Sequence, residues 1–159
     1  MNQGTKTNRS LIIWTLSLIA IGGIIGSLTK PEISTWYRVL NRSNLTPPNY
    51  IFPIAWTILY GIIGACGWLI WRARSCPKLG VIKALYVTGL ILNWSWTPLF
   101  FHYHLTGLSL IVLGAMDLLV STLIFLTYPK IRTASLLMTP YLLWILFATY
   151  LNFYIWMYN

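Results

Sequence analysis

The chain has almost no acidic residues, because Asp and Glu together number 2 among 159 residues. Charged residues of both signs make up only 8% of the sequence, whereas an ordinary soluble domain carries roughly 25%. Hydrophobic residues account for 57%, and the mean hydropathy is +0.69. This composition excludes an ordinary soluble domain and predicts an integral membrane protein in a lipid bilayer.

Residues suited to metal binding and to hydrolytic chemistry are equally scarce. The two cysteines, Cys66 and Cys76, belong to no CxxC motif and have no accompanying histidine pair, so we predict free thiols and no metal site. His102 and His104 follow an apolar run and are interpreted as polar residues of the membrane interface, not as ligands of a haem or metal. Without a carboxylate pair or a nucleophile–histidine constellation, the sequence gives no support for a hydrolytic or metal-dependent enzyme.

Five apolar runs divide the chain, and each is long enough to cross a hydrocarbon core of about 30 Å. Only Lys83 and Asp117 interrupt them with a charge. Short connections favour antiparallel neighbours. The sequence therefore predicts an all-α membrane protein, a single domain of residues 1–159 built as a bundle of five transmembrane helices. The predicted spans are 11–28, 50–71, 81–101, 105–127 and 134–157.

Apart from Lys83, the 11 basic residues lie outside the apolar runs, and they form no patch with interleaved aromatics, so we predict no nucleic-acid partner. Eight of them lie in the N-terminal tail and in the second and fourth connections, counting Lys83 at the edge of a span. The first connection holds only Lys30, Arg38 and Arg42. Because basic residues concentrate on the cytoplasmic side, we expect a cytoplasmic N-terminus, with the first loop and the C-terminus on the outer face.

The segment 35–61 begins as a polar, aromatic loop and continues into an apolar helix. Pro47 and Pro48 stiffen this loop, since proline fixes φ near −65°. Trp56 and Tyr60 stand four residues apart on the helix and therefore share a face. The pattern predicts a loop that covers a pocket with two aromatic rings below it.

Polar residues inside the spans point to the interior of the bundle. Asp117 has no basic residue at matching depth, and a lipid-facing acid would cost at least about 2.5 kcal/mol. It either points into a ligand cavity or is a hydrogen-bonded acid that joins two helices. In the third span, Asn93, Trp96 and Phe100 share one face, and Pro98 is expected to bend the helix.

The fifth span carries Trp144, Ala148 and Asn152 at four-residue spacing. A large ring with a small residue one turn away forms a slot for a flat ligand, although ordinary packing of a large residue beside a small one gives the same pattern. Both readings stay open from spacing alone.

Five separated motifs resemble the translocator protein family, also called tryptophan-rich sensory proteins or peripheral benzodiazepine receptors. The likeness covers nearly the whole chain from about residue 11. The motifs are Trp36-Tyr37, Thr46-Pro47-Pro48, Phe52-Pro53-x-x-Trp56-x-x-Leu59-Tyr60, Asn93-x-x-Trp96-Thr97-Pro98-Leu99-Phe100-Phe101, and Pro140-Tyr141-x-x-Trp144-x-x-Phe147-Ala148-x-x-Leu151-Asn152.

The resemblance implies a homodimeric five-helix bundle, in a bacterial inner membrane, with an aromatic pocket for porphyrins such as protoporphyrin IX or another flat apolar molecule. No cofactor is required, and the porphyrin is the ligand. The implied function is a receptor or sensor that regulates tetrapyrrole level. Light- and oxygen-dependent porphyrin degradation at Trp56 and Trp144, or porphyrin transport, is the alternative, so enzymatic activity stays open. The implied binding residues are Trp36, Tyr37, Pro47, Trp56, Tyr60, Asn93, Trp96, Asp117, Trp144 and Ala148.

The chain departs from the family pattern in its first loop. Where the family usually has Lys-Pro-x-Trp, this chain has Arg42-Ser43-Asn44-Leu45. The loop thus lacks one proline and one ring, and we expect it to be looser. No Lys or Arg follows Tyr150, so the cholesterol motif of the animal members is absent and sterol binding is not predicted.

Overall fold

The computed structural model describes residues 3–74 and 76–159, and the described part is almost entirely helical. Five helical segments are long and apolar enough to cross a membrane. This confirms the predicted all-α bundle of five transmembrane helices. In chain order the elements are α1 (Gln3–Ser34), α2 (Trp36–Val39), α3 (Ile51–Arg72), α4 (Leu79–Thr97), the π-helical turn η1 (Pro98–His102), α5 (Thr106–Thr127) and α6 (Arg132–Tyr158).

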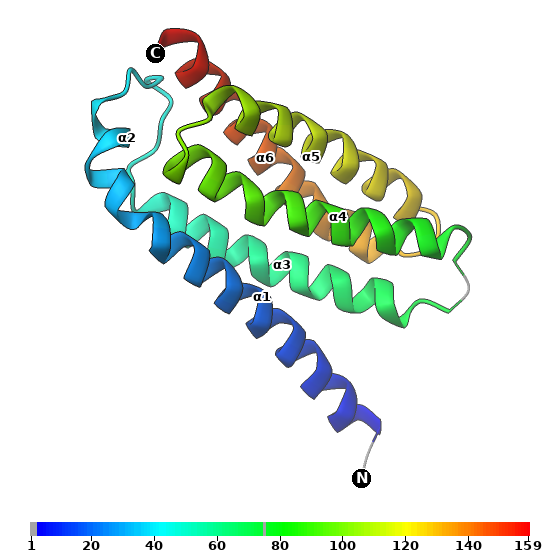
Figure 1. Cartoon of the computed structure of the whole chain (residues 1–159). Helices are drawn as coiled ribbons and strands as arrows, with labels where there is room; N and C mark the ends of the chain where they lie inside the picture. Colours follow the sequence, from blue (N-terminus) through cyan, green and yellow to red (C-terminus); the bar gives the residue numbers. More distant parts are fainter. Residues whose placement is uncertain (1–2, 75) are drawn as a thin grey trace.

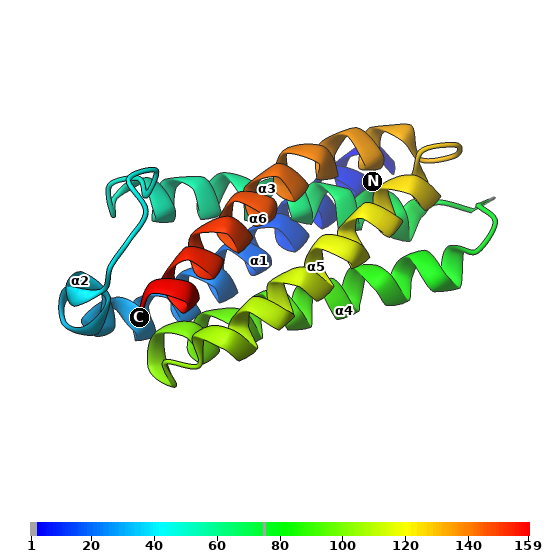
Figure 2. The same cartoon turned by 90° about the horizontal axis from the view of Figure 1, so that it is seen from above.

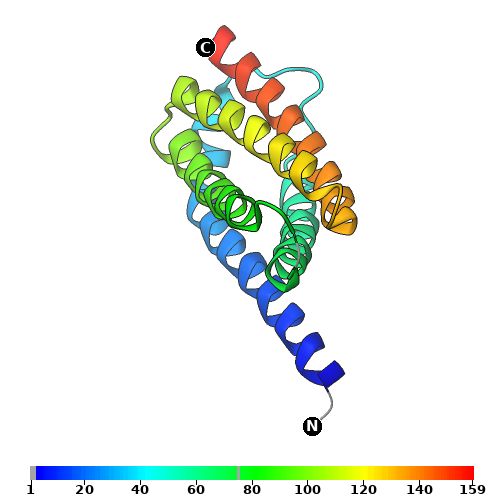
Figure 3. The same ribbon diagram turned by 90° about the vertical axis from the view of Figure 1, so that its right-hand side faces the viewer.

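The long helices pack in a ring, with α1 against α3, α3 against α6, α6 against α5, and α5 against α4 (Figures 1 and 3). The chain passes up and down the bundle, so its two ends lie at opposite ends of the molecule (Figure 2). The segment 40–50, α2, η1 and the C-terminus gather at one end, which we call the loop end. The segments 73–74, 76–78 and 128–131 lie at the other, which we call the basic end.

A core of apolar side chains from all five long helices fills the bundle. Branched residues dominate it, because they fill the space between helices in few rotamers. Ile63, Ile70, Ile82 and Ile145 are each at most 1% exposed. By contrast, α1 packs mainly on α3. Most of its apolar side chains that do not face α3 lie exposed on the outside of the bundle.

The first helix continues beyond the predicted end at residue 28. It runs to Ser34 and includes Pro31. The end of an apolar run does not stop a helix, because polar residues such as Lys30 propagate it well. The last turn is capped on its carbonyl side, since the hydroxyls of Ser34 and Thr35 both donate to the Pro31 carbonyl oxygen, at 2.8 and 3.1 Å. The predicted loop likewise begins with the one-turn helix α2.

The helix irregularity predicted at Pro98 takes the form of the π-helical turn η1. Proline lacks the N–H that an α-helix needs at this point. In the wider turn that follows, the Tyr103 N–H donates to the Pro98 carbonyl oxygen, five residues earlier, at 3.0 Å. This turn places Phe100 in the interior at the loop end, where it is 2% exposed.

Candidate functional site

A chain of buried hydrogen bonds joins three helices. The Tyr60 hydroxyl of α3 donates to Asn93 Oδ1 of α4 at 2.6 Å, and Asn93 Nδ2 donates to the Tyr141 hydroxyl of α6 at 3.1 Å. All three side chains are at most 7% exposed. An amide that both accepts and donates satisfies two hydroxyls at once. Asn93 thus fixes the positions of both tyrosine rings.

A second buried amide, Asn152 of α6, joins α4, α5 and α6. Its Oδ1 accepts from the Trp96 indole N–H at 3.2 Å and from the Ser109 hydroxyl at 3.0 Å. Its Nδ2 donates to the Thr106 carbonyl oxygen at 2.8 Å, near the start of α5. Trp96 stacks on Phe100, with ring centroids 5.3 Å apart. These bonds fix the Trp96 ring in one orientation.

Aromatic rings follow one face of α3 from the loop end inward. Phe52, Trp56 and Tyr60 recur at four-residue spacing, which places them on the same side of the helix. The Trp56 and Tyr60 centroids are 5.6 Å apart, as expected from that spacing. Phe52 makes an edge contact with Trp144 of α6 at 6.2 Å. We call these four residues the aromatic wall.

Asp117 is half-buried and lies between α5 and α6. The Thr149 hydroxyl of α6 donates to Asp117 Oδ2 at 2.8 Å. Asp117 Oδ1 is buried and has no hydrogen-bond partner among the described residues. The carboxyl group therefore joins two helices, which is one of the two alternatives left open by the sequence.

A second aromatic cluster closes the bundle at the loop end. Trp36 of α2 stacks on His104, with centroids 4.1 Å apart, and its edge contacts Phe100 at 5.5 Å. His104 Nε2 lies 3.3 Å from Glu32 Oε2 near the end of α1. His104 adopts a positive φ of 57°, which allows the short α4–α5 connection to turn back toward α1.

Tyr37 lies beneath the loop and is 5% exposed. The Arg42 guanidinium carbon is 5.0 Å from the centre of its ring, a cation–π arrangement. Burial raises the pKa of Tyr37 above its ordinary value of 10.0, and the nearby positive charge of Arg42 partly opposes this rise in pKa.

The ten residues predicted to bind ligand fall into several groups. Pro47 lines an open cavity formed by the loop, whereas Ala148 packs at the edge of the core, as Trp144 does. The aromatic and amide members contact one another or their neighbours. These are Trp36 and Tyr37 in the loop-end cluster, Trp56, Tyr60 and Trp144 in the aromatic wall, Asn93 and Trp96 in the two amide networks, and Asp117 with Thr149.

Three residues at these sites are absent from the predicted set. Tyr141 completes the Asn93 network, Thr149 is the partner of Asp117, and Arg42 lies over Tyr37. Each buried polar group needs a hydrogen-bond partner on a facing helix. Several hydroxyl side chains in the spans meet this need, so the sequence does not single out Tyr141 or Thr149. In the sequence, Arg42 stands out only by its charge and by the departure of its loop from the family's pattern.

The similarity to known proteins extends over nearly the whole chain. The profile of the TspO/MBR family matches residues 14–157. The tryptophan-rich protein TspO of Archaeoglobus fulgidus is 37% identical over 149 residues, covering 94% of this chain and 96% of that protein. The tryptophan-rich sensory protein of Cereibacter sphaeroides is 32% identical, covering 91% and 88%, and the translocator protein of Bos taurus is 32% identical, covering 89% and 86%. The chain therefore belongs to the TspO/MBR family of integral membrane proteins.

Proposed function

We propose that this protein is a membrane receptor that binds a porphyrin on the aromatic wall and regulates tetrapyrrole level. The observation that carries the proposal is the wall itself. It brings three rings of α3, the helix that follows the loop, together with Trp144 of α6. Trp56 and Trp144 are only half-buried, so their faces are accessible to a flat molecule that displaces lipid or the loop.

The chemistry of the wall suits a flat, largely apolar macrocycle. Aromatic pairs contribute about 0.5–1.5 kcal/mol each beyond the burial of their area. Asn93 is already bonded at both ends of its amide, to Tyr60 and Tyr141. Its role in the proposal is therefore to hold the Tyr60 ring in the wall, and not to contact the polar edge of the ligand.

The test is a titration of the detergent-solubilised protein with protoporphyrin IX in the dark, followed by quenching of tryptophan fluorescence. We expect saturable quenching, and an affinity about tenfold weaker in Trp56→Ala and in Trp144→Ala, from the loss of stacking and buried area. Trp156→Phe is the matched control, because Trp156 lies on α6 but is 50% exposed and outside the wall. The absence of saturable binding at micromolar porphyrin would contradict the proposal.

Illumination distinguishes a receptor from a protein that degrades the porphyrin. Degradation is the alternative that the indoles of Trp56 and Trp144 support. A porphyrin absorption spectrum that stays constant in light favours the receptor. If the spectrum changes, Trp56→Phe and Trp144→Phe are decisive, since phenylalanine keeps a stacking face but lacks the easily oxidised indole. Retained affinity with lost conversion would favour degradation. Porphyrin flux into sealed vesicles in the dark would instead favour transport.

We also propose that the basic end faces the cytoplasm and the loop end the outer side. The distribution of basic residues supports this orientation. Cys76 lies in the connection at the basic end, and Cys66 is buried, so labelling with a membrane-impermeant maleimide tests the proposal directly. In intact cells Asn44→Cys should react at once, whereas Cys76 should react only after the membrane is opened. The reverse pattern would contradict the orientation.

A further inference from the structure

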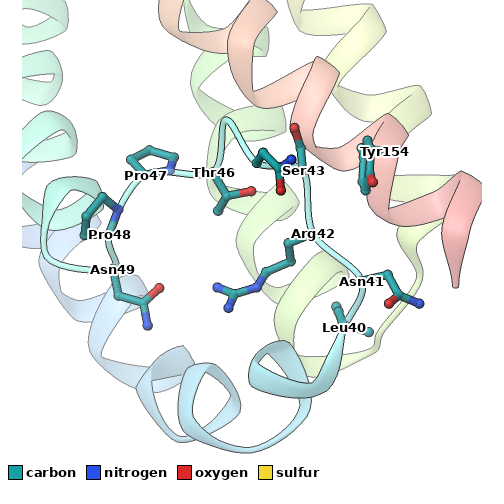
Figure 4. Close-up of a pocket in the computed structure, with 10 residues that line it drawn as sticks. Leu40, Asn41, Arg42, Ser43, Thr46, Pro47, Pro48, Asn49 and Tyr154 are labelled. Carbon is teal, nitrogen blue, oxygen red and sulfur yellow. The ribbon is translucent and has the colours of Figure 1, made fainter.

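The loop that follows α2 encloses an open cavity of about 710 Å³ at the loop end of the bundle (Figure 4). Nearly all of its lining comes from the loop, and one residue comes from α6. Amide, hydroxyl and guanidinium groups are prominent among the side chains. The lining residues are Leu40, Asn41, Arg42, Ser43, Asn44, Thr46, Pro47, Pro48, Asn49 and Tyr154.

The loop is held to α6 by hydrogen bonds, so the cavity is a built feature of the fold. Ser43, which is 7% exposed, lies 2.9 Å from the Tyr150 hydroxyl. Asn41 and Asn159 bond reciprocally: the Asn41 N–H donates to Asn159 Oδ1 at 2.9 Å, and Asn159 Nδ2 donates to the Asn41 carbonyl oxygen at 3.1 Å. Both sets of hydrogen bonds lie on the side of the cavity that faces α6.

The cavity contains a positive charge with no acidic residue among its lining. The Arg42 side chain extends into the space that the loop encloses (Figure 4). The two acidic residues of the chain have other partners, since Glu32 lies against His104 and Asp117 accepts from Thr149. A half-buried guanidinium presents several N–H donors in one plane and matches the geometry of a carboxylate.

The cavity adjoins the aromatic wall. Asn49 lines it, and α3 begins two residues later at Ile51, whose N–H donates to the Pro48 carbonyl oxygen at 2.9 Å. Phe52, the next residue, contacts Trp144 of the wall. A ligand whose flat part lies on the wall can therefore extend an acidic side group into the loop cavity.

We propose that the loop cavity is a carboxylate-binding subsite in which Arg42 pairs with the acidic group of the ligand. Asn44, Thr46 and Asn49 supply further polar groups around it. The inference rests on the proposed function in that the flat part of the ligand lies on the aromatic wall. It adds a preference among flat ligands, because acidic ligands bind more tightly than their neutral counterparts.

The test compares protoporphyrin IX with its dimethyl ester, which keeps the macrocycle and removes both negative charges. In the unaltered protein we expect the acid to bind about tenfold more tightly than the ester, as a charge-assisted hydrogen-bonded pair allows. Arg42→Gln should weaken binding of the acid about tenfold and leave the ester unchanged. Arg42→Lys should keep part of the preference, since lysine is a point charge without the planar fork.

Arg38→Gln is the matched control. Arg38 carries the same charge four residues earlier, but it is exposed and does not line the cavity. It should retain the full preference for the acid. Equal loss of preference in Arg38→Gln and Arg42→Gln would overturn the subsite, because it would reduce the effect to general attraction. A protein with no preference for the acid would overturn it as well.

A separate ligand pair distinguishes failure of the subsite from failure of the proposed function. If neither porphyrin form binds, the porphyrin proposal fails, and 1-pyrenebutyrate is compared with its methyl ester on the same variants. An Arg42-dependent preference for this smaller flat acid would support the subsite by itself, and equal binding of acid and ester would overturn it. Thermal unfolding of each variant confirms that it is folded, and Arg42→Lys with a salt titration replaces Arg42→Gln if that variant unfolds.

Discussion

The buried amide networks and the contact between α1 and α3 stabilise the bundle in different ways. Toward the loop end, buried amides and tyrosines connect the helices through side-chain hydrogen bonds, and rings stack between them. One turn further along α3 from Tyr60, α1 and α3 approach so closely that Gly64 has no room for a side chain. A methyl group added at Gly64 would lie 2.7 Å from the Thr15 Cα atom. Directional bonds can be exchanged for bonds to a ligand, whereas close backbone packing cannot, so we expect ligand-dependent change in the amide networks and not in the contact of α1 with α3.

Removing the Asn93 amide should have the largest effect on stability. In Asn93→Leu the buried hydroxyls of Tyr60 and Tyr141 lose their partner. Each unsatisfied buried group costs about 1–3 kcal/mol, so the free energy of unfolding should fall by roughly 3 kcal/mol. Thermal unfolding in detergent measures the change.

The same variant carries its own control. Adding Tyr60→Phe and Tyr141→Phe to Asn93→Leu removes both stranded hydroxyls, and replacing all partners by apolar groups is nearly neutral. Most of the lost stability should return. If the triple variant is no more stable than Asn93→Leu alone, the loss comes from packing and not from the hydrogen bonds.

Gly64→Ala tests the contact of α1 with α3 and should have the next largest effect. The new methyl group would meet the backbone of Thr15, which cannot rotate away, and α1 must shift from α3. Overpacking of this kind costs about 1–3 kcal/mol. Gly61→Ala on the same helix is the control, because nothing lies within 4 Å of its added methyl group. Equal melting temperatures for the two variants would contradict the close packing of α1 on α3.

Features set by one helix alone were predictable from the sequence. The approximate spans and the shared faces of Trp56 with Tyr60 and of Trp96 with Phe100 follow from local helix geometry, which fixes which residues are four apart. The length of α1 was missed because hydropathy records where a helix leaves the apolar core, not where its hydrogen bonds end.

Contacts between helices were not predictable, because they depend on how each helix is rotated. Asn93 required a partner, but only the rotation of α4 and α6 within the bundle selects Tyr141. Thr149 was equally hidden as the partner of Asp117. The position of Arg42 depends on the path of the loop, which carries no periodic pattern. The candidate site was therefore predicted as a set of rings and amides, without the bonds that organise them.

A smaller effect is expected at Asp117. Hydrogen bonds between membrane helices contribute about 0.6 kcal/mol on average, so Thr149→Val should lower the free energy of unfolding by about that amount. Asp117→Asn keeps an oxygen that accepts from Thr149, and both stability and porphyrin affinity should change little. A marked loss of porphyrin affinity in Asp117→Asn, with unchanged stability, would instead assign this residue to the ligand cavity.

The smallest effect on stability at neutral pH is expected for Tyr37→Phe, and the difference from the unaltered protein should change only in alkaline solution. Burial favours the neutral phenol and raises the Tyr37 pKa above 10.0 in the folded protein, with Arg42 partly opposing the rise. The folded pKa therefore exceeds the unfolded one, and this contribution to stability is fully present below pH 10.0 and is lost as the pH rises through the folded pKa.

Melting curves of the unaltered protein and of Tyr37→Phe, recorded from neutral pH to above pH 10.0, should converge or cross at the alkaline end. Tyr103→Phe, which alters a 61% exposed tyrosine at the same end, is the control. Parallel curves for Tyr37→Phe would mean that the loop end opens to water before the phenol ionises, and the loop would then not be held to α6 as Ser43 and Asn41 indicate.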